Sequence, residues 1–129
     1  MTPRTDAPLT LTDFVRYQGA SGDMNPIHHD PAFAQAAGYP GPFAVGMLAA
    51  GRLATFVTDA YGAASVRRFR VRFSEQAWPG DVLTYAGTAG QEREEGGERV
   101  VDLELVCTRQ TGGVHLRGWA TVATAAGPA

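Results

Sequence analysis

The chain has 129 residues and a formal net charge of −2, with 44% hydrophobic and 19% charged residues. This composition is typical of one globular domain and argues against disorder. The small net charge gives no electrostatic reason to expect nucleic acid or an anionic membrane as a partner. The single cysteine excludes an intramolecular disulfide, and no run reaches the ~18–20 apolar residues of a membrane span. We therefore expect a single domain over residues 1–129 in the cytoplasm.

The first predicted elements are a short strand and a helix. Residues 9–11 are compatible with a strand, which Pro8 limits to an edge or an irregular entry. Thr10 and Asp13 have the spacing of a capping box and predict a helix that ends near Gly19.

Two more helices are predicted before the strands. Asp30 and Pro31 have the form of an N-cap followed by proline at the first helical position, and Gly38 ends this short helix. The longest apolar run, residues 43–61, predicts a helix that is apolar around most of its circumference. Such a helix is typically buried, so Met47 within it is expected in the core or along an acyl tunnel.

From residue 65 the hydrophobic period changes to two, which predicts strands. Phe69, Val71 and Phe73 alternate with arginines in the first strand, and further strands are expected around 82–89, 101–108 and 114–122. Residues 92–98 read as a charged loop. Helices followed by antiparallel strands indicate an α+β fold in which a helix lies on a sheet.

The loop between the first two helices carries Asp23-Met24-Asn25-Pro26-Ile27-His28. Pro26 fixes its own φ and favours an extended Asn25, so the segment is predicted to be a shaped turn. Such a turn can aim the Asp23 carboxylate and the His28 imidazole at one point. A carboxylate can hold a charge and a hydrogen bond, and an imidazole changes protonation near neutral pH, so either group can be the base in acid–base chemistry. The sequence leaves these two roles open.

Together with Ser21-Gly22, Asp30, Gly38, Gly46-Met47-Leu48 and Gly80-Asp81, this motif resembles the MaoC-like (R)-specific enoyl-CoA hydratase and 3-hydroxyacyl-ACP dehydratase family over about residues 9–124. The resemblance implies a hot-dog domain, in which a curved antiparallel sheet wraps a long central helix. It also implies a lyase of fatty acid metabolism that reversibly hydrates trans-2-enoyl thioesters to (R)-3-hydroxyacyl thioesters. The substrate would carry coenzyme A or the phosphopantetheine of an acyl carrier protein. No further cofactor or metal is expected.

The resemblance further implies that Asp23 and His28 are the catalytic pair and that the backbone N–H of Gly46 binds the thioester oxygen. Asn25 and Met47 are expected beside the substrate, although Asn25 can also serve only to shape the loop. Many relatives have histidine where this chain has Val45, but a main-chain donor does not depend on that side chain. The working unit implied is a homodimer, or a hetero-oligomer with a related hot-dog subunit.

Other interpretations remain open at this stage. A hot-dog thioesterase needs a water-activating carboxylate but not the Asn-Pro-x-His string. A third interpretation is not enzymatic: an acyl-binding subunit of a larger assembly. A metal site built from His28, His29 and Asp30 is disfavoured because consecutive side chains rarely converge.

Overall fold

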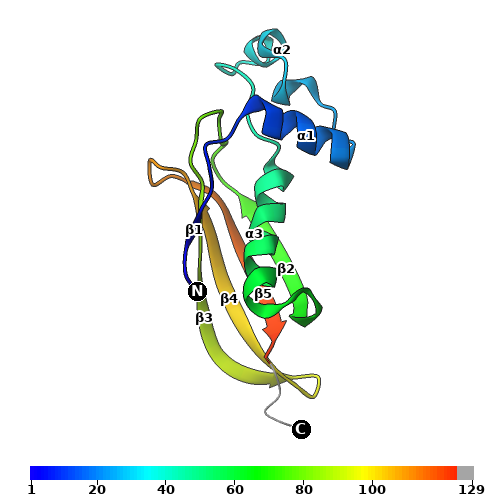
Figure 1. Ribbon diagram of the computed structural model, residues 1–129, viewed down its shortest axis with the longest axis vertical. Helices are drawn as coiled ribbons and strands as arrows, with labels where there is room; N and C mark the ends of the chain where they lie inside the picture. Colours follow the sequence, from blue (N-terminus) through cyan, green and yellow to red (C-terminus); the bar gives the residue numbers. More distant parts are fainter. Residues whose placement is uncertain (125–129) are drawn as a thin grey trace.

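The computed structural model describes residues 1–124 and shows an antiparallel sheet that curves around one long helix (Figure 1). The five strands lie in the order β1-β3-β4-β5-β2. Their bounds are β1 Arg4–Thr5, β2 Val66–Phe73, β3 Thr84–Glu95, β4 Glu98–Thr108 and β5 Val114–Ala123. The helices are α1 Leu11–Ser21, α2 Pro31–Ala36 and α3 Gly46–Tyr61. The predicted α+β architecture, a curved sheet wrapped around a central helix, is confirmed.

The capping box at the start of α1 is present as predicted. Thr10 Oγ1 accepts from the Asp13 N–H at 3.1 Å, and the Thr10 N–H donates to Asp13 Oδ2 at 2.9 Å. The helix runs past Gly19 and ends before Gly22, where φ is 78°. Only glycine adopts this left-handed conformation without strain, so Gly22 is the residue that ends α1.

The prediction of a first strand at residues 9–11 is wrong. β1 lies earlier, where Arg4 and Thr5 pair with β3. Pro8 has no N–H to donate and interrupts any longer pairing. Leu9 is nevertheless buried, and its N–H donates to the carbonyl oxygen of Asp81 at 2.9 Å. The segment before α1 is therefore anchored to the rest of the fold without being a strand.

The core lies between α3 and the sheet. Leu53, Phe56 and Val57 of α3 are buried together with Leu103 and Leu105 of β4. The opposite side of α3 is open, since Met47 is 53% exposed, so the expectation that Met47 lies in the core is wrong for the isolated chain. A helix with apolar residues on an open face is one that a second surface can cover.

The charged segment 92–98 is mostly strand, in contrast to the predicted loop. β3 and β4 continue as a hairpin up to a turn at Gly96 and Gly97. Cross-strand ion pairs stabilise this end, such as Arg93 Nε to Asp102 Oδ2 at 2.8 Å. No helix within residues 1–124 is long and apolar enough to cross a membrane.

Candidate functional site

The motif loop has the shaped form that its proline predicts. Asn25 Oδ1 accepts from the Ile27 N–H at 3.1 Å and caps a short 3₁₀ turn, Pro26–His28. Gln18 on α1 is fully buried and donates from Nε2 to the Asn25 carbonyl oxygen at 3.0 Å. The sequence does not show which loop a polar side chain on a helix will contact, so the support that Gln18 gives to this loop could not be predicted.

His28 is buried at the end of the turn, and its ring orientation is fixed by the backbone. Its Nδ1 lies 2.8 Å from the carbonyl oxygen of Phe43, and the Phe43 ring packs edge-on against the imidazole. A carbonyl oxygen only accepts, so Nδ1 carries the hydrogen in this contact. In the neutral ring Nε2 then holds the lone pair, which is the atom that can accept a proton.

His28 and Gly46 line one cavity of about 180 Å³, although they come from different elements. Gly46 is the first residue of α3, so its N–H has no partner within the helix and lies at the positive end of the helix dipole. A Cβ at this position would lie 2.8 Å from the ring of Phe73, which explains the glycine by close packing. The cavity lining thus includes an imidazole and the residue that carries the first free N–H of α3.

The other three predicted site residues lie outside the lining of this cavity. Asp23 is exposed, and its Oδ1 accepts from the Asn25 N–H at 3.3 Å, so it shapes the loop it belongs to. Asn25 is exposed and occupied in the same loop, and Met47 is exposed on α3. The pairing of Asp23 with His28 therefore stays a prediction, as do the substrate contacts of Asn25 and Met47.

A second histidine, His115 of β5, lines the same cavity and was not predicted. Its Nδ1 lies 2.6 Å from the carbonyl oxygen of Glu75, and the residue is 3% exposed. Burial lowers the pKa of its imidazole, so the ring is neutral near pH 7. Its Nε2 is buried and has no hydrogen-bond partner among residues 1–124.

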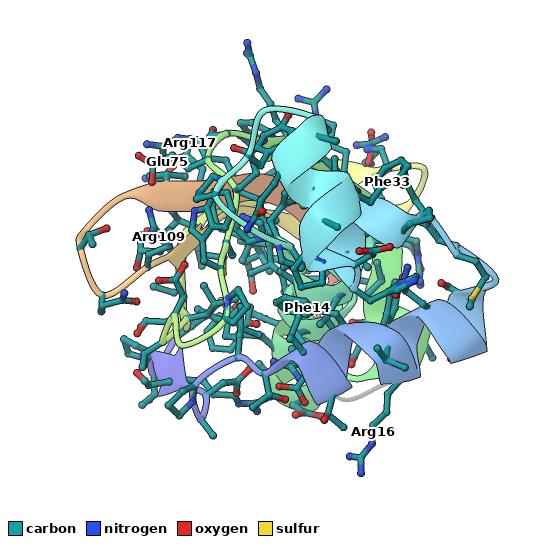
Figure 2. The ribbon with its side chains drawn as sticks, turned by 90° about the horizontal axis from the view of Figure 1, so that it is seen from above. Phe14, Arg16, Phe33, Glu75, Arg109 and Arg117 are labelled. Atoms are coloured by element: carbon teal, nitrogen blue, oxygen red, sulfur yellow. The ribbon has the colours of Figure 1, made fainter. Side chains whose placement is uncertain are left out.

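Residues 74–76, which follow β2 in the chain, form part of the cavity wall, and a charged cluster holds this segment in place. Asp81 is buried and accepts from Arg109 Nε at 2.8 Å, from Gln110 Nε2 at 2.7 Å and from the Trp78 N–H at 2.7 Å. Arg109 also reaches Glu75 at 3.3 Å, and both side chains are labelled on the same side of the molecule in Figure 2. The cluster therefore ties the segment that carries Glu75, the partner of His115, to the end of β4.

Replacing Asp81 by asparagine should lower the free energy of unfolding at pH 7 by about 2 kcal/mol, because hydrogen bonds to a charged group contribute about 1.5–3 kcal/mol. Burial by itself raises the pKa of Asp81, but the hydrogen bonds from Arg109, Gln110 and Trp78 outweigh it and hold the pKa below the ordinary 3.8. Asp81 therefore contributes its full stabilisation above pH 3.8, the ordinary pKa of the carboxyl in the unfolded chain. The contribution is lost as the pH falls from there through the lower pKa of the folded protein. Urea unfolding at several pH values measures this difference.

The difference in the free energy of unfolding between wild type and Asp81→Asn should shrink on acidification. The other carboxylates are the same in both proteins, so their contributions cancel in this difference. Asp59→Asn is the matched control, since Asp59 pairs with Arg4 at the surface and its loss should cost little. Equal unfolding of Asp81→Asn and wild type at pH 7 would contradict the role given to the cluster.

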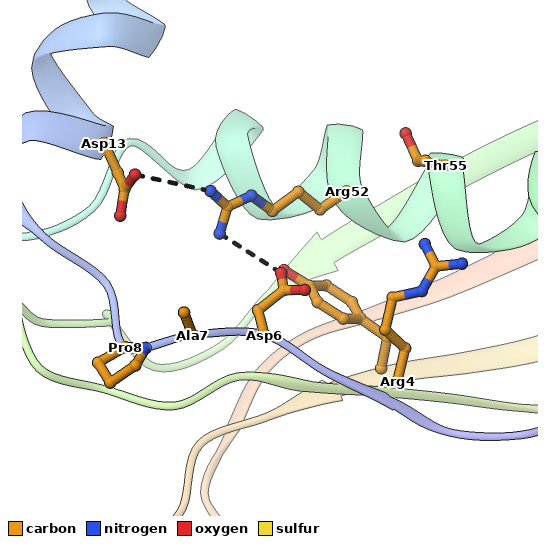
Figure 3. A pocket seen from close by; sticks show the side chains of 8 residues that line it. Arg4, Asp6, Ala7, Pro8, Asp13, Arg52 and Thr55 are labelled. Atoms are coloured by element: carbon orange, nitrogen blue, oxygen red, sulfur yellow. Dashed lines mark hydrogen bonds and ion pairs between the residues drawn. The ribbon is translucent and has the colours of Figure 1, made fainter.

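A separate hollow of about 340 Å³ lies between the N-terminal segment and α3 (Figure 3). Arg52 of α3 reaches Asp6 at 3.4 Å and Asp13 at 4.0 Å across it. These contacts connect α3 with the N-terminal segment and with α1. No residue of the predicted site lines this hollow, so we assign it to structure.

Comparisons with known proteins agree with the fold. A family model described as "MaoC like domain" matches residues 1–109. An enoyl-CoA hydratase of Mycobacterium tuberculosis, ChsH3, is 41% identical over 66 residues, which is 49% of this chain and 23% of that protein. The 3-hydroxyacyl-thioester dehydratase Y of the same organism is 36% identical over 85 residues, 63% of this chain and 29% of that protein. The chain thus spans between 23% and 29% of the length of these two relatives.

Among solved structures, an (R)-hydratase from A. caviae, described as involved in PHA biosynthesis, superposes with a TM-score of 0.82. The match covers 94% of this chain and 91% of that one, at 23% sequence identity. At this identity the similarity shows that the two chains share a fold.

Proposed function

The chain belongs to the MaoC-like domain family, and from that premise we propose that it is a lyase that hydrates enoyl thioesters. The proposed reaction adds water reversibly to trans-2-enoyl thioesters of coenzyme A or acyl carrier protein and gives (R)-3-hydroxyacyl thioesters. It uses no cofactor beyond the carrier of the substrate. On the sequence evidence we expect the reaction in the cytoplasm.

The observation that carries the proposal is the orientation of His28. Its Nδ1 is bound to the Phe43 carbonyl oxygen, so Nε2 is available as a base at the cavity it lines. Water is a weak nucleophile, and a positioned base that takes its proton gives typically 10²–10⁴-fold in rate. Asp23 is proposed to assist at the same face of the substrate as a proton carrier.

Gly46 supports the second half of the reaction. As water adds at C3, negative charge builds on the thioester oxygen, which an N–H donor stabilises. The first N–H of α3 lies at the cavity and carries the partial positive charge of the helix N-terminus. Base and donor thus act on the two ends of the same conjugated system.

We propose that the working unit contains two such chains, as a homodimer or with a related hot-dog subunit. β2 is an edge strand of the sheet, and Phe73 on it is 48% exposed. Met47 on the open side of α3 is 53% exposed, and exposed apolar side chains of this size are ones that subunit contacts can cover. Light scattering of the purified protein measures the mass, and a fully active monomer would contradict this unit.

The activity is tested by following the absorbance of the enoyl thioester across acyl chain lengths, with coenzyme A and with acyl carrier protein. Loss of the conjugated double bond together with formation of an (R)-3-hydroxyacyl product is the expected result. Release of free thiol without a change in the double bond would indicate a thioesterase instead. Turnover that needs a second chain would indicate an acyl-binding subunit.

A further inference from the structure

The candidate cavity is lined by two histidines that are held in the same way. His28 and His115 each direct Nδ1 at a backbone carbonyl oxygen, that of Phe43 at 2.8 Å and that of Glu75 at 2.6 Å. Carbonyl oxygens accept only, so each neutral ring carries its hydrogen on Nδ1 and its lone pair on Nε2. The cavity lining therefore includes two imidazole rings with the same tautomer.

The buried Nε2 of His115 calls for an explanation. No protein atom within residues 1–124 is hydrogen-bonded to it. A buried acceptor left without a partner costs about 1–3 kcal/mol, so native structures rarely retain one without a use. The hydrogen bond to the Glu75 carbonyl oxygen does not require an acceptor at Nε2, because a side chain with only a donor at the position of Nδ1 would make the same hydrogen bond.

The chemistry of the substrate limits what this nitrogen can bind. A lone pair accepts from O–H or N–H groups, whereas the thioester oxygen of an enoyl substrate is itself an acceptor. The reacting carbons of that substrate carry neither O–H nor N–H. The donors beside them are the attacking water in one direction and the 3-hydroxyl group in the other. Water has two O–H groups, and only one proton is removed by the base.

We propose that Nε2 of His115 accepts a hydrogen bond from the attacking water, through the O–H group that stays intact. This hydrogen bond orients the nucleophile for His28. This rests on the proposed hydratase activity. The other O–H bond of the water breaks and its proton passes to His28, while the oxygen forms a bond to C3. The double-bond electrons move towards the thioester oxygen near Gly46. As they return, C2 takes the proton held by His28, which leaves the imidazole neutral again. The O–H held by His115 remains as the hydroxyl of the product.

Two substitutions separate this role from a structural one. His115→Asn keeps a donor for the Glu75 carbonyl oxygen and removes the acceptor at Nε2. His115→Gln places an amide oxygen near Nε2 and gives up the donor at Nδ1. We expect His115→Asn to lower kcat by about 10- to 100-fold, with KM nearly unchanged, since misplacing a reacting group by about 1 Å can cost 10²-fold. His115→Gln should restore most of kcat even where its melting temperature falls.

Steady-state kinetics with enoyl-CoA and thermal unfolding of both variants give the answer. Wild-type kcat in His115→Asn would overturn the proposal. The proposal would also be overturned if kcat followed the melting temperature and was lower in His115→Gln than in His115→Asn. That pattern would mean that the hydrogen bond to Glu75 has a purely structural role. Absence of hydration by the wild type would instead mean that the proposed function itself fails.

Discussion

Replacing His28 by asparagine is expected to lower kcat/KM for enoyl-thioester hydration by about 10²–10⁴-fold, the usual contribution of a general base. Asparagine has a donor near the position of Nδ1 and can keep the hydrogen bond to the Phe43 carbonyl oxygen, which is 2.8 Å long in the wild type. It has no atom at the position of Nε2, so the base is removed while the loop retains its anchor. Initial rates of hydration at several substrate concentrations measure the change.

His29 provides the matched control for this experiment. It is the next residue in the same loop, and its Nδ1 contacts Gln18 Oε1 at 2.8 Å and does not line the cavity. His29→Asn should therefore leave kcat close to that of the wild type. Equal losses in the two variants would mean that the loop and not the imidazole of His28 is needed, and an active His28→Asn would remove it from the mechanism.

The local signals of the sequence predicted the parts of the site that lie at element boundaries. His28 follows a proline turn and Gly46 begins a long apolar helix, and both patterns can be recognised within a few residues. The structure brings these two residues to one cavity. In contrast, His115 sits in the middle of a strand, where an alternating pattern says only which face a residue occupies.

The open side of α3 shows a different limit of sequence reasoning. Apolar residues around most of a helix predict burial, but they do not say whether the same chain or another one covers each side. Leu53 and Phe56 are buried by the sheet of their own chain, whereas Met47 is exposed. The two-residue strand β1 could not be predicted either, because Arg4–Thr5 is too short to have a period.

The loop at Asp23 shows why proximity in sequence does not establish a catalytic pair. Asp23 lies near His28 in the chain, but its carboxylate is exposed and accepts from the Asn25 N–H within the turn. An Asx turn of this kind needs an aspartate or asparagine for shape alone. The geometry thus supports His28 as the base more strongly than it supports Asp23.

Replacing Gly46 by proline should lower kcat by about 10²–10³-fold, the usual effect of removing one oxyanion donor. Proline lacks the N–H, yet its fixed φ suits the first position of a helix. Val45 before it has φ −63° and ψ 116°, an extended conformation that a following proline accepts. The start of α3 can therefore persist in the variant, which circular dichroism checks, while hydration rates report the loss of the donor.

Gly46→Ala separates the lost N–H from the added carbon. Both variants add a Cβ that would lie 2.8 Å from the ring of Phe73 in its present position. The half-exposed Phe73 side chain can move outward to make room. Alanine keeps the donor, so kcat should be much higher in Gly46→Ala than in Gly46→Pro. If the two variants lose activity equally, the glycine serves close packing against Phe73 and the oxyanion must be stabilised by another group. If Gly46→Pro alone is inactive and still folded, the main-chain N–H at the start of α3 is the donor that the reaction uses.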